Sequence, residues 1–208
     1  MSATILVATT NRGKLAELSA MLALDVSVKW VGLDAFAGLA EVVEDGADFA
    51  ENARIKALGY ARATGLWTLA DDSGLVIDAL GGEPGVLSAR YSGPARPGED
   101  RRAVDKRNNL LVLERLRDVA DERRTSRFVC CLCLAEPSRV LIETRGILEG
   151  RILRGPRGES GFGYDPIFYV PELGRTVAEL GAEEKNAVSH RGRAVAALRP
   201  KLARLLAT

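Results

Sequence analysis

The chain has 208 residues, of which 47% are hydrophobic and 27% are charged, a balance typical of globular rather than disordered proteins. The 29 basic and 28 acidic side chains leave a net charge of +1, so the overall charge favours neither nucleic acid nor an anionic membrane as a partner. No basic stretch precedes the first apolar segment, as it would in a signal peptide, and no apolar run approaches the ~20 residues of a membrane helix. We expect a globular protein of one domain or two packed lobes.

The three cysteines lie together in one apolar run, at Cys130, Cys131 and Cys133. Cysteines this close cannot close a useful loop through a disulfide, and their spacing is not that of a zinc site. We therefore expect reduced cysteines, buried in a strand of a cytoplasmic protein.

The first elements alternate between strand and helix. Residues 3–9 are apolar and β-branched, as in a buried strand, and residues 15–24 have helical spacing. A second strand is expected over residues 26–31. Asp48 and Glu51 then have the spacing of a capping box, which predicts the start of a helix.

That helix should end near Thr64, because a glycine follows it. The sequence next predicts a strand over residues 66–70, a polar turn over 71–74 and a further strand over 75–80. Residues 81–98 hold five glycines and three prolines, so we expect a long ordered loop there, with a boundary between lobes near 93–98.

The second half of the chain combines a hairpin with helices. In chain order we expect a charged helix over 99–118, a hairpin of strands over 127–136 and 139–148, a strand over 166–170, and a helical C-terminal part with Ser189 as N-cap and a kink at Pro200. Strands and helices mixed in this way, with an antiparallel pair, favour an α/β fold with a mixed sheet.

A candidate phosphate-binding loop joins the first strand to the first helix. The N-terminus of a helix offers backbone N–H groups and the positive end of the helix dipole to an anion. The loop lacks the glycine spacing of a Walker A motif, and an ordinary turn with a surface lysine is the alternative. Its residues are Thr9, Thr10, Asn11, Arg12, Gly13 and Lys14.

Acidic residues precede the next helix. Glu41 and Glu44 lie ahead of a helix on which Asn52 and Lys56 share one face. The alternative to a functional cluster is a solvated acidic loop that compensates the helix dipole.

A second acidic cluster follows the strand expected over residues 66–70. The adjacent carboxylates of Asp71 and Asp72 repel each other unless a cation or a proton intervenes. One or two carboxylates, with phosphates completing the shell, are the usual ligands of Mg²⁺, and strand ends in α/β sheets are where ligands bind. The alternative is a polar turn.

The last third of the chain holds two candidate nucleotide-binding clusters. Glycines around Phe162 let the backbone approach a flat base, on which the ring could stack. His190, the only histidine, stands beside Arg191, and both could donate to a base carbonyl, while Lys185 could meet a phosphate. Aromatic packing and a structural histidine beside a helix cap are the alternatives.

Taken together and in this order, the clusters resemble the inosine triphosphate pyrophosphatase family, the non-standard purine nucleoside triphosphate pyrophosphatases. The resemblance implies an elongated mixed β-sheet with flanking helices, two lobes around a central substrate cleft, a single domain over residues 1–208, and a homodimer. The matching segments, between residues 8 and 194, are ATTNRGKLAEL, FAENARIKA, LADDSGLVIDALGGEPGVLSARYSG, GESGFGYDPIFYVPELGRTVAEL and EEKNAVSHRGRA.

The resemblance also implies a role for each matching residue. Asp72 corresponds to the proton acceptor and to a ligand of Mg²⁺, with Glu44 as a second ligand and Asp71 nearby; Glu41 is the alternative to Glu44. Thr10 departs from the family, in which a small residue such as glycine often precedes the asparagine. The implied substrate contacts are Thr9, Thr10, Asn11, Arg12, Gly13, Lys14, Lys56, Ser73, Phe162, Gly163, Tyr164, Asp165, Lys185, His190 and Arg191.

The expected reaction is attack of water on the α-phosphorus, with release of pyrophosphate whose charge Lys14, Lys56 and Lys185 stabilise. One alternative is a related pyrophosphatase acting on pyrimidine or methylated nucleotides. A nucleotide-binding regulator is disfavoured by the acidic pair. A binder of single-stranded nucleic acid is disfavoured by the near-zero net charge and the 5% of aromatic residues. We expect neither a nucleic-acid nor a membrane partner.

Overall fold

The computed structural model describes residues 3–22 and 28–207. Its helices are α1 (Arg12–Leu22), α2 (Phe49–Thr64), α3 (Arg101–Arg115), α4 (Ala182–Val188) and α5 (His190–Leu206). Its strands are β1 (Ala3–Ala8), β2 (Val28–Gly32), β3 (Trp67–Ile77), β4 (Thr125–Ala135), β5 (Val140–Ile152), β6 (Phe168–Val170) and β7 (Arg175–Thr176).

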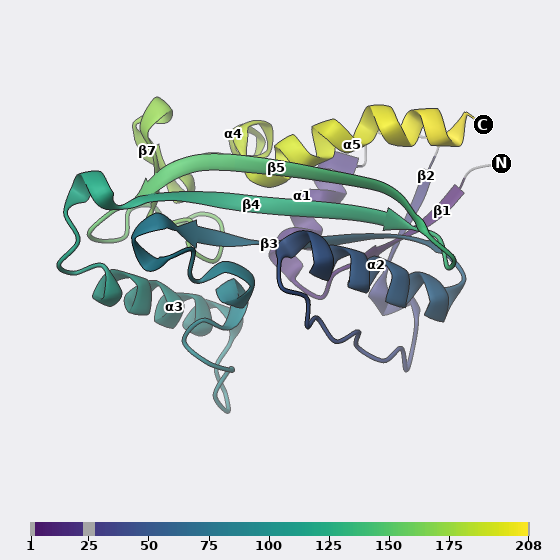
Figure 1. Cartoon of the computed structure of the whole chain (residues 1–208), viewed down its shortest axis with the longest axis horizontal. Coiled ribbons are helices and arrows are strands. Elements are labelled where there is room, and N and C mark those ends of the chain that lie inside the picture. The colour runs from purple at the N-terminus through teal and green to yellow at the C-terminus, as the bar shows by residue number, and fades with distance from the viewer. Residues whose placement is uncertain (1–2, 23–27, 208) are drawn as a thin grey trace. The chain divides into compact units, whose positions relative to one another are not determined.

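The strands form one sheet in the order β2-β1-β3-β4-β5-β6-β7 (Figure 1). β1 pairs in parallel with β2 and β3, whereas β6 pairs antiparallel with β5 and β7. β4 and β5 are neighbours joined by a short turn, in which the N–H of Glu136 donates to the carbonyl of Arg139 at 3.0 Å. The predicted α/β fold with a mixed sheet and a hairpin is confirmed.

Two compact units are each assembled from several segments of the chain. The predicted boundary near residues 93–98 is wrong, because the glycine-rich segment 81–98 lies wholly within the second unit and includes a 3₁₀ helix at Gly85–Arg90. The first unit comprises Met1–Asp72, Cys130–Gly146 and His190–Thr208, and the second comprises Ser73–Val129 and Ile147–Ser189.

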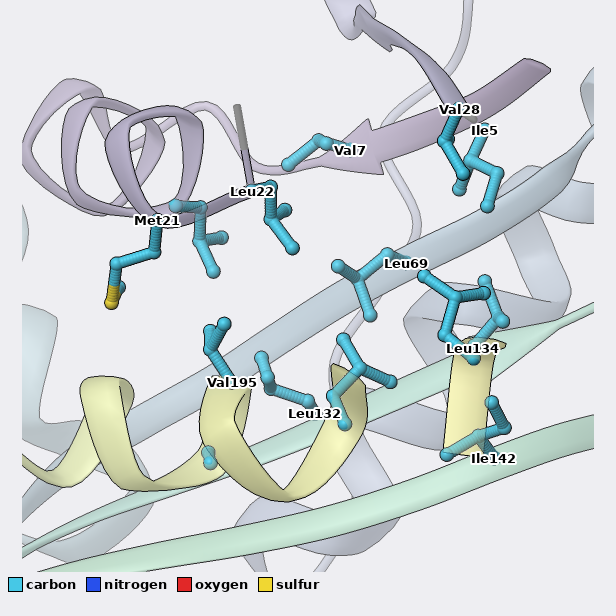
Figure 2. Packing of buried hydrophobic residues seen from close by; sticks show 14 of the residues in the cluster. Ile5, Val7, Met21, Leu22, Val28, Leu69, Leu132, Leu134, Ile142 and Val195 are labelled. Carbon is cyan, nitrogen blue, oxygen red and sulfur yellow. The ribbon is translucent and has the colours of Figure 1, made fainter. Parts of the chain in front are cut away.

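The core of the first unit lies between the sheet and the helices α1 and α5. Alternate residues of a strand face one side of a sheet, so Leu132 and Leu134 of β4 point with Leu69 of β3 toward these helices (Figure 2). By the same alternation, Cys131 and Cys133 face the other side of the sheet. Helix α2 covers that side (Figure 1). All three cysteines are buried and carry no disulfide, as expected.

The start of α2 confirms its predicted cap and changes one detail. The carboxylate of Asp48 accepts the N–H of Glu51 at 2.8 Å, and Gly65, at φ 73°, ends the helix with an N–H bond to Ala61. The carboxylate of Glu51, however, accepts the N–H of Ala47 at 2.7 Å rather than that of Asp48. The reciprocal bond of a capping box therefore forms one residue earlier than predicted.

The C-terminal part consists of two helices. Ser189 is the C-cap residue of α4 and directly precedes α5, and Pro200 lies inside α5. α5 approaches β5 so closely that a Cβ atom on Gly146 would stand 2.0 Å from the carbonyl oxygen of His190. A glycine at this position therefore allows the first turn of α5 to lie on the sheet.

The second unit has its own hydrophobic core. It gathers the end of β3, α3, the start of β4, the end of β5 and β6, and the rings of Phe128 and Phe168 stack within it at a centroid distance of 4.2 Å. Among the helices of the described residues, none combines the length and the apolar character needed to cross a membrane.

Candidate active site

The acidic pair Asp71 and Asp72 lies inside a strand rather than in a turn. β3 runs without interruption from Trp67 to Ile77, so the predicted polar turn over 71–74 is wrong, and the strand expected over 75–80 is the end of β3 followed by a 3₁₀ turn. Because neighbouring side chains of a strand point to opposite faces, Asp71 points toward α1 and α5 and Asp72 toward α2.

On the first face, Asp71 is fully enclosed by donors. Its Oδ1 lies 2.7 Å from the ammonium of Lys14, and its Oδ2 accepts the Nε–H of Arg191 at 2.8 Å and the thiol of Cys130 at 3.2 Å. The side chain of Asp71 is 0% exposed and that of Arg191 is 1% exposed. Arg191 also donates to the carboxylate of Glu17 on α1.

These ion pairs set the charge of Asp71. Burial alone would raise the pKa of Asp71, but the positive charges of Arg191 and Lys14 hold it well below its usual range. Burial raises the pKa of the Cys130 thiol, and the charge of Asp71 adds to that rise. The network therefore consists of an ionised carboxylate between two cations, with an unreactive thiol beside it.

On the second face, Asp72 shares its surroundings with Glu44 and Lys56. Burial raises the pKa of Asp72 to about 6; the charges of Glu44 and Asp71 add to the rise, and those of Lys14 and Lys56 oppose it. Lys56 bridges the site, since its ammonium lies 2.8 Å from Glu44 and donates to the backbone carbonyl of Asp71 at 3.2 Å. A carboxyl whose pKa is raised in this way is a stronger base than an exposed aspartate.

The acidic loop ahead of α2 is hydrogen-bonded to that helix, and its contacts favour Glu44 over Glu41 as the candidate metal ligand. The N–H of Gly46 donates to the side chain of Asn52 on α2 at 2.8 Å. Glu44 is partly buried and paired with Lys56, whereas Glu41 is exposed and forms no ion pair with a described residue. The charge of Glu44, and not that of Glu41, acts on Asp72.

The loop between β1 and α1 is ordered by its own side chains. Thr9 accepts the N–H of Asn11 at 3.2 Å, and the amide oxygen of Asn11 accepts the N–H groups of Gly13 and Lys14 at 3.0 and 3.2 Å. Asn11 thus caps α1, a role that the sequence did not suggest. Lys14 emerges from the first turn of the helix, and the side chains of Thr10 and Arg12 are exposed.

The second unit brings together the glycine-rich loop expected to bind the base and Lys185, which was expected to meet a phosphate. The carboxylate of Asp165 accepts the N–H of Phe162 at 2.8 Å and pairs with the ammonium of Lys185 at 2.5 Å. That ammonium lies 4.6 Å from the centroid of the Phe162 ring. Tyr164 is buried and donates its hydroxyl to the carbonyl of Ser88 at 2.8 Å. Lys185 therefore belongs to the same cluster as Phe162, which its position in the sequence did not reveal.

The predicted site residues thus fall into two sets, one in each unit. Two residues of the buried network, Glu17 and Cys130, were not predicted. Glu17 stands three residues after Lys14, a spacing that puts both on one face of α1. This spacing could have predicted that Glu17 lies near Lys14. The first unit holds Thr9 to Lys14, Glu44, Lys56, Asp71, Asp72, His190 and Arg191, and the second holds Ser73, Phe162 to Asp165 and Lys185.

Known proteins resemble this chain over nearly its whole length. Two of the most similar relatives are named dITP/XTP pyrophosphatase: one from Thermus thermophilus is 51% identical over 93% of this chain and 89% of its own length, and one from Geobacter sulfurreducens is 50% identical over 95% and 96%. The structure of a HAM1 protein from Coxiella burnetii matches with a TM-score of 0.86 at 42% identity, covering 97% of this chain and 99% of its own.

A second solved structure, of a nucleoside-triphosphatase / dITP/XTP pyrophosphatase from Mycobacterium abscessus, matches with a TM-score of 0.75 at 48% identity, over 95% of this chain and 99% of its own. The model of the Ham1 family matches residues 5–201. By sequence and by fold, this chain belongs to the Ham1 family.

Proposed function

We propose that the chain hydrolyses the non-standard purine nucleoside triphosphates ITP, dITP and XTP to the monophosphate and pyrophosphate, and so removes them from the nucleotide pool. The observation that carries this proposal is the surroundings of Asp72. A carboxyl with a raised pKa stands beside a second carboxylate and two lysines, in a family whose relatives are named for this reaction.

In the proposed reaction, Asp72 accepts a proton from the water that attacks the α-phosphorus. Lys14 and Lys56, whose ammonium groups converge on the acidic segment of β3, stabilise the negative charge that develops on the leaving pyrophosphate. The N-terminus of α1 adds its dipole to the same task.

The donors around Asp72 fit a magnesium ion. Among the described residues there is no group of three or more His, Cys, Asp or Glu side chains that could hold a metal. Mg²⁺ needs only one or two carboxylates when phosphates supply the other ligands, and the mutual repulsion of Glu44 and Asp72 is what a dication would relieve. When bound, the ion would neutralise phosphate oxygens and make the water more acidic.

The proposed ligands are Glu44 and Asp72, without Asp71. The sequence suggested that Asp71 lies near the metal, but both of its oxygens accept bonds from Lys14, Arg191 and Cys130 on the other face of β3. We assign Asp71 instead to holding the two cations in place.

For the base, we propose that Phe162 stacks on the purine, and that Arg191, His190 or nearby backbone N–H groups donate to its 6-keto group. Because Lys185 pairs with Asp165 beside the Phe162 ring, we assign Lys185 to the base rather than to the leaving pyrophosphate. Adenine presents an amino donor at that position, which would leave a donor of the protein unpaired. An unpaired buried polar group costs about 1–3 kcal/mol, so adenine should be rejected by at least about tenfold. The family resemblance implies that guanine, which shares the 6-keto group, is excluded through its 2-amino group.

With a panel of nucleoside triphosphates, we expect pyrophosphate from ITP, dITP and XTP, at rates at least about tenfold above that from dATP. Chelation of Mg²⁺ should abolish turnover, and added Mg²⁺ should restore it. Pyrimidine and methylated nucleoside triphosphates are included in the panel, because a related pyrophosphatase that acts on them is the alternative function. Preferred turnover of a pyrimidine or methylated nucleotide, or release of orthophosphate with a diphosphate, would refute the proposal.

We further propose that the protein is a cytoplasmic homodimer. The family resemblance supports the dimer, and the three reduced, buried cysteines support the location. Light scattering at micromolar concentration should give about twice the chain mass of 22.3 kDa. A particle with the mass of a single chain would contradict the dimer.

A further inference from the structure

We propose that Asp105 and Asn109 on α3 are positioning residues that hold the peptide of Gly163, and through it the loop of Phe162 that binds the base. Neither residue belongs to the contacts expected from the family resemblance. The inference rests on the proposed function, which gives this loop its task, but the geometry that carries it lies entirely within the second unit.

Asp105 and Asn109 form hydrogen bonds with both backbone groups of Gly163, its N–H and its carbonyl. They stand four residues apart and therefore share a face of α3. The carboxylate of Asp105 accepts the N–H of Gly163 at 2.8 Å, and the amide of Asn109 donates to the carbonyl of Gly163 at 3.0 Å. An acceptor and a donor placed in this order fix both the position and the orientation of the backbone between them.

The loop has a shape that needs such support. Gly163 has a φ of 62°, in the left-handed region, and Gly161 before it has a φ of 79°. A Cβ atom on Gly161 would stand 2.1 Å from the carboxylate of Asp165, which bonds the N–H of Phe162. Asp165, a residue of the loop itself, therefore binds the N–H of Phe162, and α3 binds the next residue, Gly163.

Asp105 occupies a position that is costly for a carboxylate. It is buried, and burial raises its pKa, while the N–H of Gly163 and the charge of Arg101 oppose that rise. Arg101 lies 3.0 Å from it, one turn earlier on α3. A buried carboxylate is tolerated when hydrogen bonds and a counter-charge compensate its lost hydration, and the N–H of Gly163 and the guanidinium of Arg101 provide both for Asp105.

The consequence concerns selectivity for the base rather than the chemical step. Phe162 directly precedes Gly163, and the held N–H belongs to the peptide group that joins these two residues. The ammonium of Lys185 lies over the Phe162 ring. Loss of the hydrogen bonds to Gly163 would let Phe162 and the ammonium above its ring shift. Substrates would then lose the contacts that depend on the identity of the base. Contacts to the triphosphate, which we assign to residues outside this loop, would remain.

The test compares Asp105→Ala, which removes the acceptor, with Asp105→Asn, whose amide oxygen can still accept the N–H of Gly163. Asn109→Ala tests the other bond, and Lys106→Ala, an exposed position on the same helix, is the matched control. The readout is the ratio of kcat/KM for dITP to that for dATP. We expect Asp105→Ala to reduce this ratio about tenfold, mainly through a higher KM for dITP, and Asp105→Asn to retain most of it.

A role in stability alone would change the fraction of folded enzyme, which lowers both rates together and leaves the ratio unchanged. An unchanged ratio in Asp105→Ala therefore overturns the inference. Hydrogen exchange at the Gly163 amide provides a readout independent of activity, and exchange should be at least about tenfold faster in Asp105→Ala than in Asp105→Asn. If the unmodified chain does not hydrolyse dITP, the proposed function fails. Equal exchange rates in the two variants would overturn the inference that Asp105 holds Gly163.

Discussion

Asp72→Asn is expected to lower kcat for dITP by about 10²–10⁴-fold, the usual contribution of a general base. Asparagine preserves the shape of the side chain but cannot accept a proton from water, and it removes one negative charge from the proposed metal site. The raised pKa of Asp72, caused by burial and opposed by Lys14 and Lys56, shows that the carboxyl is tuned by its surroundings. The loss should therefore appear in kcat more than in KM, because the interaction matters most in the transition state.

The measurement is steady-state kinetics of pyrophosphate release at saturating Mg²⁺, which compensates for weaker metal binding. Asp34→Asn is the matched control, since Asp34 is an exposed aspartate in the short 3₁₀ helix after β2. Asp34→Asn should keep kcat close to that of the unmodified protein. An Asp72→Asn variant with near-normal kcat would exclude Asp72 as the base.

The second large effect is expected from Arg191→Met, which should lower the free energy of unfolding by about 3–5 kcal/mol. Arg191 is 1% exposed and lies between the carboxylates of Asp71 and Glu17. Removing the guanidinium leaves Asp71 buried with one cationic partner fewer, and an uncompensated buried charge costs far more than a lost surface ion pair.

Urea unfolding followed by circular dichroism measures this loss. Arg204→Met, an exposed arginine of the same helix α5, is the control and should change the free energy of unfolding by less than about 0.5 kcal/mol. If Arg191 donates to the 6-keto group of the base, folded Arg191→Met should also show a smaller ratio of kcat/KM for dITP to that for dATP. A variant as stable as the unmodified protein would contradict the buried network, and an unchanged preference would limit Arg191 to a structural role.

The periodicity of the sequence was enough to predict most of the regular elements. β1, α2 and the β4–β5 hairpin follow from local signals, such as the apolar run at residues 3–9 and the cap at Asp48, because these elements are specified by neighbouring residues. Their bounds shifted by a few residues. The strands expected on either side of residues 71–74 are a single strand, because local polarity predicts a turn there.

The reason that β3 continues through Asp71 and Asp72 lies far away in the sequence. The carboxylate of Asp71 is compensated by Lys14 and by Arg191, which is 120 residues later in the chain. No window of neighbouring residues contains that pairing. The hydrogen bonds to Gly163 are equally distant in the sequence, because their partners on α3 stand 58 and 54 residues before it. The motifs predicted which residues are candidates for the site, but not the face of the sheet on which each side chain lies.

The most direct test of the central claim is to follow the oxygen of the attacking water. When dITP is hydrolysed in water enriched in the heavy oxygen isotope, attack on the α-phosphorus by a water that Asp72 deprotonates puts the label into the nucleoside monophosphate and leaves pyrophosphate unlabelled. Mass spectrometry of the two products after a single turnover reads the outcome. We predict one labelled oxygen in dIMP, whereas label in pyrophosphate would mean attack on the β-phosphorus and would contradict the proposed reaction.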